Sequence, residues 1–250
     1  MTYTKLIFKS TSPKPHDFIG SKIRGVLGYT LKDDVCINPS FICKDCFAKD
    51  KCIFYDMYEK QNQAHQYKFE FELYDKEFKF SLFLFHNLED HAYKISIAVL
   101  ESLKEYKDIK MEIEKKEFSL KNYSPIVKVN FITPLRIKSN DKFATSSNEL
   151  DLITILSSIN RLYYDISSKQ YEKLNISKDY KIISSHLRYK KILRQSNRQN
   201  KKMEFGGLMG DMIVSNIDKK SYELLKFGEL VGVGKNRVFG LGNIKIEDIG

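Results

Sequence analysis

The sequence predicts an α+β protein built from two tandem ferredoxin-like domains, residues 1–123 and 124–250. Three observations lead to this fold class. The expected elements follow the order βαββαβ twice, which is the order of the split-βαβ unit. Tyr123-Ser-Pro125 is a candidate linker between the two runs. The 250 residues are enough for two domains that each bury a core.

Hydrophobic periodicity supplies the elements of the first domain. Ile23, Leu27 and Leu31 recur at helical spacing, whereas Tyr67 and Phe69 alternate with charged residues as in a half-buried strand. The expected elements are strand 2–9, helix 17–32, strand 67–73, strand 78–85, helix 90–107 and strand 111–120.

The second domain repeats this order in pattern, although the two halves are not obviously similar in sequence. Its helix at 148–166 carries Leu152, Ile155, Ile159 and Leu162 on one face. The expected elements are strand 126–132, helix 148–166, a strand within 184–197, strand 208–214, helix 219–230 and strand 239–246.

Positive charge is concentrated in the second half of the chain. The net charge is +10, yet residues 1–123 hold 20 Lys/Arg against 19 Asp/Glu and residues 124–250 hold 22 against 13. The segment 188–202 alone has seven basic residues and no acidic one. A face that binds a polyanion such as RNA would explain this asymmetry. A solvated basic surface is the alternative that charge alone leaves open.

The chain shows neither an apolar run of membrane-spanning length nor the hydrophobic region of a signal peptide. We therefore expect a cytoplasmic protein with no membrane partner. Its cysteines are then expected to be reduced rather than paired in disulfides.

All the cysteines of the chain fall within one short segment, about residues 36–52, which we expect to be an insertion in the first domain. The Cys43-Lys-Asp-Cys46 gap is typical of a zinc knuckle, and two further thiolates would complete a closed tetrahedral site. Such a site favours a structural Zn²⁺ rather than a catalytic metal, because no coordination position stays open. The alternative is four buried thiols without metal. The predicted metal ligands are Cys36, Cys43, Cys46 and Cys52.

A glycine-rich segment near the C-terminus brackets two cations. Glycine allows a positive φ and a close backbone approach, so the segment is expected to form a loop whose amides and cations cradle phosphates. Neither the Walker nor the dinucleotide-binding spacing is present. The residues concerned are Gly232, Gly234, Lys235, Arg237, Gly240 and Gly242.

Several short motifs, in their order and spacing, resemble a known family over almost the whole chain. They are Gly20-Ser-Lys-Ile-Arg-Gly-Val-Leu-Gly28, the four cysteines followed by Tyr55, Phe131-Ile-Thr-Pro-Leu-Arg136, Arg194-Gln-Ser-Asn-Arg-Gln199, Phe205-Gly-Gly-Leu-Met-Gly210 and the glycine segment. Together they resemble the CRISPR precursor-RNA processing endoribonucleases of the RAMP superfamily, in its cysteine-containing branch.

This resemblance implies two ferredoxin-like domains that bind CRISPR repeat RNA and cleave it. It also implies cleavage without a catalytic cofactor, through attack of a ribose 2′-OH that leaves a 2′,3′-cyclic phosphate and a 5′-hydroxyl. Such chemistry needs a general base, a general acid and cations near the reacting phosphate. CRISPR effector complex proteins are candidate partners, and the chain is expected to be a monomer or homodimer.

The candidate catalytic residues are His16, Tyr29, Lys32 and His186. His16 stands just before the first helix, where relatives often place the base, and His186 precedes the basic run; an exposed structural residue is the alternative for each. Relatives often carry a histidine at the position of Gly232, so the base is expected elsewhere in this chain. The predicted RNA-binding residues are Arg194, Arg198, Lys201, Lys202, Lys235 and Arg237, with Gly232, Gly234, Gly240 and Gly242 shaping the loop.

Two other functions remain open at this point. One is a non-catalytic RAMP subunit that binds guide RNA within an effector complex. The other is a zinc-stabilised RNA-binding or scaffolding protein without a role in CRISPR systems.

Overall fold

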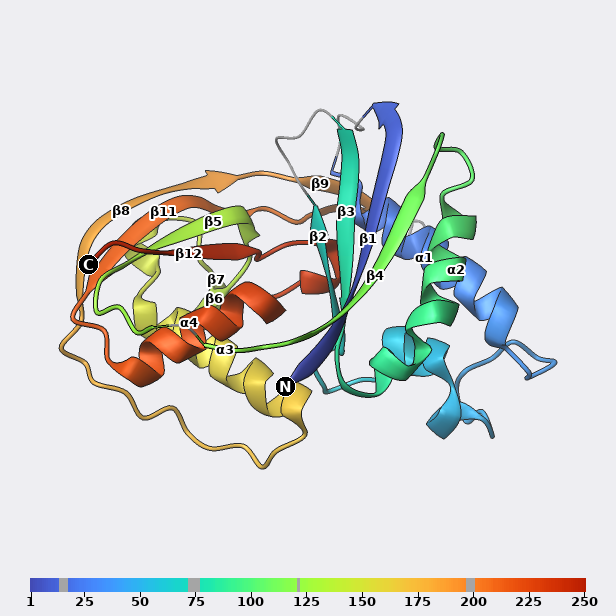
Figure 1. The fold of residues 1–250 in the computed structure, drawn as a ribbon, viewed down its shortest axis with the longest axis horizontal. Coiled ribbons are helices and arrows are strands. Elements are labelled where there is room, and N and C mark those ends of the chain that lie inside the picture. The colour runs from blue at the N-terminus through green and yellow to red at the C-terminus, as the bar shows by residue number, and fades with distance from the viewer. Residues whose placement is uncertain (14–17, 72–76, 121, 197–200) are drawn as a thin grey trace. The chain divides into compact units, whose positions relative to one another are not determined.

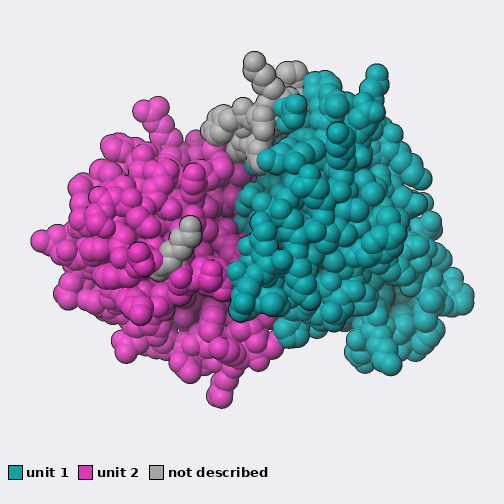
Figure 2. Space-filling view, in the orientation of Figure 1, with its two compact units in different colours: residues 1–117 teal, residues 118–250 magenta. Residues whose placement is uncertain are grey.

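The structure, a computed structural model, describes residues 1–13, 18–71, 77–120, 122–196 and 201–250. It divides the chain into two compact units, residues 1–117 and 118–250 (Figures 1 and 2). Each unit is an antiparallel four-stranded sheet with two helices on one face (Figure 1). Among the described residues, none of the helices has the length and apolar character needed to cross a membrane.

The first unit has the strand order β2-β3-β1-β4, which is the ferredoxin-like order. Leu6 and Phe8 of β1, Leu82 of the neighbouring β3 and Phe69 of the edge strand β2 are almost fully buried. Tyr67, Phe69 and Phe71 are buried as expected, but Lys68 between them is also fully buried, so β2 is not the half-exposed strand that the sequence suggested. The elements are β1 (Thr2–Pro13), α1 (Gly20–Val35), β2 (Tyr67–Phe71), β3 (Glu77–Leu84), α2 (Ala92–Ser102) and β4 (Lys110–Glu117), with short helical turns at Lys49–Lys51, Tyr55–Glu59 and His86–His91.

The second unit repeats this topology with the strand order β12-β5-β11-β8. Val127, Val129 and Phe131 of β5 face the core, where Leu156 and Ile159 of α3 are also buried. The elements are β5 (Val127–Leu135), β6 (Lys138–Ser139), β7 (Lys142–Phe143), α3 (Leu152–Ser167), β8 (Lys181–Lys190), β9 (Leu193–Ser196), β10 (Lys201–Glu204), β11 (Gly207–Ser215), α4 (Lys219–Val231) and β12 (Ile244–Asp248), with short helical turns at Ser147–Glu149 and Arg237–Phe239. The fold class expected from the sequence is thus confirmed.

The segment that leads into the second unit packs against helix α4 of that unit. The Phe118 ring meets Phe227 edge-on with centroids 5.6 Å apart, and the Tyr123 ring meets Tyr222 at 5.7 Å. The Tyr123 hydroxyl also donates to the Ile217 carbonyl. These contacts explain why the compact unit begins a few residues before the boundary that the sequence suggested.

Two stretches of the second unit differ from the expected elements. Within 184–197 the expected strand is the end of β8, and the described residues also include β9, the first strand of a β9-β10 hairpin that the sequence did not indicate. The last strand begins at Ile244 instead of residue 239, because Gly240 and Gly242 take φ values of +83° and +68° that interrupt an extended chain. Both differences come from backbone geometry that periodicity does not register.

Candidate functional site

The glycine loop, residues 232–243, connects α4 to β12 and is packed tightly against the rest of its unit. Gly234 has a φ of +75°, and a Cβ there would stand 2.5 Å from the Arg136 carbonyl oxygen. Gly242 has a φ of +68°, and its Cβ would stand 1.9 Å from the Val233 carbonyl oxygen. Glycine is therefore required at both positions by conformation and by space.

The backbone amides of the four loop glycines all donate hydrogen bonds within the protein. This corrects the expected role of these amides as a phosphate cradle, since a donor already bonded to a carbonyl or hydroxyl is not free to bind an anion. The donors are Gly232 to the Gly228 carbonyl at 2.8 Å, Gly234 to the Ser158 hydroxyl at 3.1 Å, Gly240 to the Arg237 carbonyl at 2.9 Å and Gly242 to the Pro134 carbonyl at 3.0 Å.

The two cations of the loop have different surroundings. Arg237 is only 5% exposed and donates to the Val231 carbonyl, so its guanidinium braces the loop. Its burial does not suit the phosphate contact expected from the sequence. Lys235 is exposed, and its backbone amide is bonded to the Arg136 carbonyl at 2.7 Å. Of the two, only Lys235 offers its charge to a ligand.

Replacing Gly242 by alanine is expected to destabilise the protein by at least about 2 kcal/mol, because the new Cβ meets a carbonyl oxygen at a left-handed φ. The matched control is Gly25→Ala in α1, where the added Cβ has nothing within 4 Å. That change should stabilise by about 0.5–1 kcal/mol, the usual gain of alanine over glycine in a helix. Urea unfolding of both variants measures the difference, and equal midpoints would contradict the assigned loop geometry.

A histidine and an aspartate pair across neighbouring strands of the second unit. His186 of β8 is in register with Asp211 of β11, and the His186 Nδ1 lies 3.3 Å from the Asp211 Oδ1. The Lys128 ammonium lies 3.9 Å from the other oxygen of Asp211. The His186 side chain is 71% exposed. With Nδ1 turned to the carboxylate, Nε2 is the nitrogen that faces solvent and can accept a proton.

The basic run occupies the end of β8 and the β9-β10 hairpin. Arg194 lies on β9 opposite Met203, and Lys201 and Lys202 lie on β10 opposite Ser196 and Gln195. Arg198 falls outside the described residues. The structure thus carries Arg194, Lys201 and Lys202 on one hairpin, which connects β8 to β11 along the chain.

An acidic residue, Glu204, lies at the end of β10 in this hairpin. Glu204 accepts a hydrogen bond from the Tyr189 hydroxyl at 2.7 Å and pairs with Lys191 at 3.3 Å. These two contacts hold the pKa of Glu204 below its usual value. Lys191 is therefore already paired with a carboxylate, unlike a cation that is free to meet a phosphate.

Of the candidate catalytic residues of the first unit, the structure describes Tyr29 and Lys32, both on α1. His16 lies outside the described residues. Tyr29 is 78% exposed on α1, so its hydroxyl is open to solvent. Lys32, one turn further along α1, lines the cavity that holds the cysteines, with its Nζ 5.1 Å from the centroid of the Phe54 ring. This position joins Lys32 to the cysteines and leaves its expected catalytic role without support.

Asp211, the partner of His186, cannot be identified from the sequence alone. Only the pairing of β8 with β11 brings these residues together, since they lie 25 positions apart along the chain. The sequence offers one signal: Leu208 and Met212 are apolar residues of one strand face, which places the polar Asp211 on the opposite face.

The fold of the two units is shared with solved structures of known proteins. A fold of two ferredoxin-like units is shared with a Cas6 (TTHB231) product complex at a TM-score of 0.62 and 12% identity, covering 99% of both chains. A Cas6 (TTHA0078) substrate mimic complex matches at 0.54 and 12%, covering 99% of this chain and 100% of the other. A structure described as a RAMP protein binding different RNA substrates matches at 0.54 and 14%, again covering 99% and 100%. These similarities show that the chain has the fold of two tandem ferredoxin-like domains.

The family is more specific than the fold. Residues 129–244 match the family model of the CRISPR-associated endoribonuclease Cas6, and residues 8–123 match the model of the AF_1859 N-terminal domain. The second unit thus matches the Cas6 endoribonuclease family over most of its length, and the resemblance to CRISPR RNA-processing endoribonucleases stated from the sequence motifs is confirmed. No curated protein matches the chain.

Proposed function

We propose that this chain is an endoribonuclease that binds CRISPR repeat RNA and cuts precursor transcripts into guide RNAs. The observation that carries the proposal is the Cas6 family match over residues 129–244, the part of the chain that also holds the excess positive charge. A basic hairpin and an exposed lysine in the glycine loop suit a phosphate backbone, whose contacts dominate RNA affinity.

The proposed reaction is attack of a ribose 2′-OH on the adjacent phosphate. A general base takes the 2′-OH proton, the bond from phosphorus to the 5′-oxygen breaks, and a general acid protonates that oxygen. The products are a 2′,3′-cyclic phosphate and a 5′-hydroxyl. Atoms balance without water or a metal ion.

His186 is the candidate base that the described residues support best. Asp211 holds its Nδ1, as the carboxylate of a catalytic triad holds a histidine, and Nε2 is exposed for the proton. His16 is the second candidate, on the grounds of its place in the sequence. Tyr29 offers an exposed hydroxyl as a candidate acid.

A non-catalytic RAMP subunit that binds guide RNA is the alternative function. The observation that favours it is Gly232: relatives often carry a histidine there, whereas this chain has a glycine buried in a packed loop. Such a subunit would keep the basic hairpin and the fold while lacking a base of its own.

Incubation of the full chain with a repeat-containing transcript in EDTA separates the two functions. Cleavage at one position, with a cyclic phosphate on the upstream product, is the expected result. Tight binding of the repeat without cleavage would overturn the enzyme and favour the subunit. A transcript with a 2′-deoxy nucleotide before the cleaved bond is the matched control, and it should stay intact because the attacking hydroxyl is absent.

A further inference from the structure

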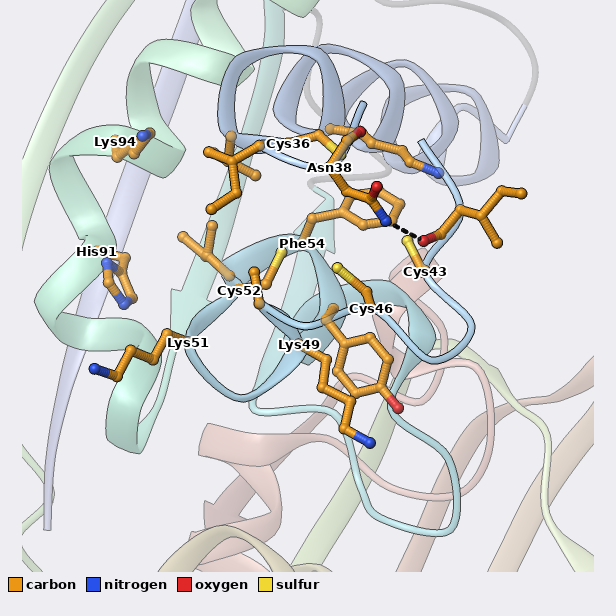
Figure 3. Close-up of a pocket in the computed structure, with 17 residues that line it drawn as sticks. Cys36, Asn38, Cys43, Cys46, Lys49, Lys51, Cys52, Phe54, His91 and Lys94 are labelled. Atoms are coloured by element: carbon orange, nitrogen blue, oxygen red, sulfur yellow. Dashed lines mark hydrogen bonds between the residues drawn. The ribbon is translucent and has the colours of Figure 1, made fainter. Parts of the chain in front are cut away.

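The four cysteines line a single cavity in the first unit. It has a volume of about 290 Å³ and lies where the chain leaves α1 and runs into the helical turn at Tyr55–Glu59. Figure 3 shows the sulfur atoms of Cys36, Cys43, Cys46 and Cys52 around this space. All four thiols are free and half-buried. The fold thus brings four cysteines that are spread over residues 36–52 to one place.

The segment around this cavity has little structure that would hold it by itself. Between α1 and Tyr55 its regular structure is one 3-10 turn at Lys49–Lys51. Reverse-turn bonds join Cys46 to Cys43 and Lys49 to Cys46, each at 3.3 Å. Four large apolar side chains are left exposed: Ile37 is 70% exposed, Phe41 47%, Ile42 60% and Phe47 75%. A segment with so small a core needs a cross-link to be ordered.

The charges around the cavity favour bound thiolates. Lysines are the main charged residues of its lining, which includes no carboxylate. A divalent metal held by four thiolates carries a net charge of about −2, which nearby ammonium groups offset. The four lysines are Lys32, Lys49, Lys51 and Lys94, of which Lys94 also pairs with Asp34 at 3.7 Å.

We propose that Cys36, Cys43, Cys46 and Cys52 bind one thiophilic divalent cation, Zn²⁺, in a closed tetrathiolate site. The two-residue gap between Cys43 and Cys46 lets both thiols reach one ion, and each ligating thiol loses its proton on binding. As the described residues stand, no three His, Cys, Asp or Glu side chains are close enough to hold a metal. Binding must therefore draw the sulfurs together, which the sparsely bonded segment allows.

The proposed site would also tie the insertion to helix α1. The chain just after Cys52 packs on that helix through Tyr58, whose hydroxyl donates to the Arg24 carbonyl at 2.8 Å. The Tyr58 ring lies against Gly28, where a Cβ would stand 2.6 Å from it, and under the Arg24 guanidinium at 4.4 Å. Metal binding would thus tie both ends of the insertion to α1, which carries Tyr29.

Metal analysis of the purified full-length chain tests the proposal independently of RNA cleavage. About one zinc per chain should remain after gel filtration, and replacement by Co²⁺ should give the visible absorption of a tetrahedral thiolate site. Cys43→Ser and Cys46→Ser should each lose most of the metal. Lys44→Ser, between them but outside the cavity lining, is the matched control and should retain it.

If a cysteine variant does not fold, the zinc site can be tested on the wild-type chain instead. A chelator of high zinc affinity should release about one zinc and expose four thiols to a thiol reagent, and the thermal midpoint should fall. A chain that has no metal and four reactive thiols, a disulfide in the fresh protein, or bound iron with sulfide would each overturn the zinc site. Retention of zinc by the Cys43→Ser/Cys46→Ser double variant would do so as well.

Discussion

Replacing His186 by alanine is expected to slow single-turnover cleavage of repeat RNA by about 10²–10⁴-fold, the usual contribution of an acid-base group. The reason is that His186 combines an exposed Nε2 with an Nδ1 held by Asp211 at 3.3 Å. RNA affinity should stay within about threefold, since the variant removes a proton acceptor rather than a phosphate contact.

Two further variants separate the roles of the pair. Asp211→Asn should slow cleavage by more than about tenfold, because an amide no longer holds the imidazole in the tautomer and orientation that leave Nε2 free to accept a proton. Ser184→Ala is the matched control. Ser184 lies on β8, the strand of His186, and its hydroxyl is buried without a hydrogen-bond partner among the described residues. This variant should leave the rate unchanged.

The same assay decides between the two candidate histidines. A loss of activity in His16→Ala with a normal rate in His186→Ala would move the base to the first domain. If neither variant slows cleavage by at least about tenfold, both assignments are wrong. Cleavage would then depend on a base that neither sequence position nor strand pairing identified.

Much of the fold could be predicted from the sequence because its elements follow simple periodicities. Tyr67, Phe69 and Phe71 alternate with charged residues, and the structure buries all three. Once both halves show the order βαββαβ, few antiparallel arrangements of four strands remain. The strand orders found in the two units are those of that small set.

The candidate site could be predicted only in part, because its contacts join residues that are distant along the chain. Glycine at 242 indicates a special φ, but not that its amide bonds Pro134, more than 100 positions earlier. From the sequence, Arg237 is expected to contact phosphate, whereas in the fold its side chain is buried and donates to the Val231 carbonyl. The His186–Asp211 pair depends on the register of β8 and β11, and a slip of one residue would separate the two side chains onto opposite faces.

The β9-β10 hairpin is expected to supply most of the salt-dependent binding of RNA. A triple variant, Arg194→Ala/Lys201→Ala/Lys202→Ala, should lower the slope of log affinity against log salt by about 2, since each lost phosphate contact on single-stranded RNA accounts for about 0.7. At about 0.1 M salt the same arithmetic gives a loss of affinity near 10²-fold. Titrations of labelled repeat RNA at several salt concentrations measure both quantities.

Two controls show whether the effect belongs to the hairpin or to net charge. Lys104→Ala/Lys107→Ala/Lys110→Ala removes the same charge from exposed positions of the first unit and should change the slope by less than about 0.5. Arg237→Met should leave the slope unchanged but destabilise the fold by about 1–3 kcal/mol, because the buried Val231 carbonyl loses a donor. Equal slopes for the hairpin triple and the first-unit triple would mean that RNA senses only overall charge, and the hairpin would lose its assigned role. A lower slope in Arg237→Met would instead return that arginine to the RNA interface, against its burial in the glycine loop.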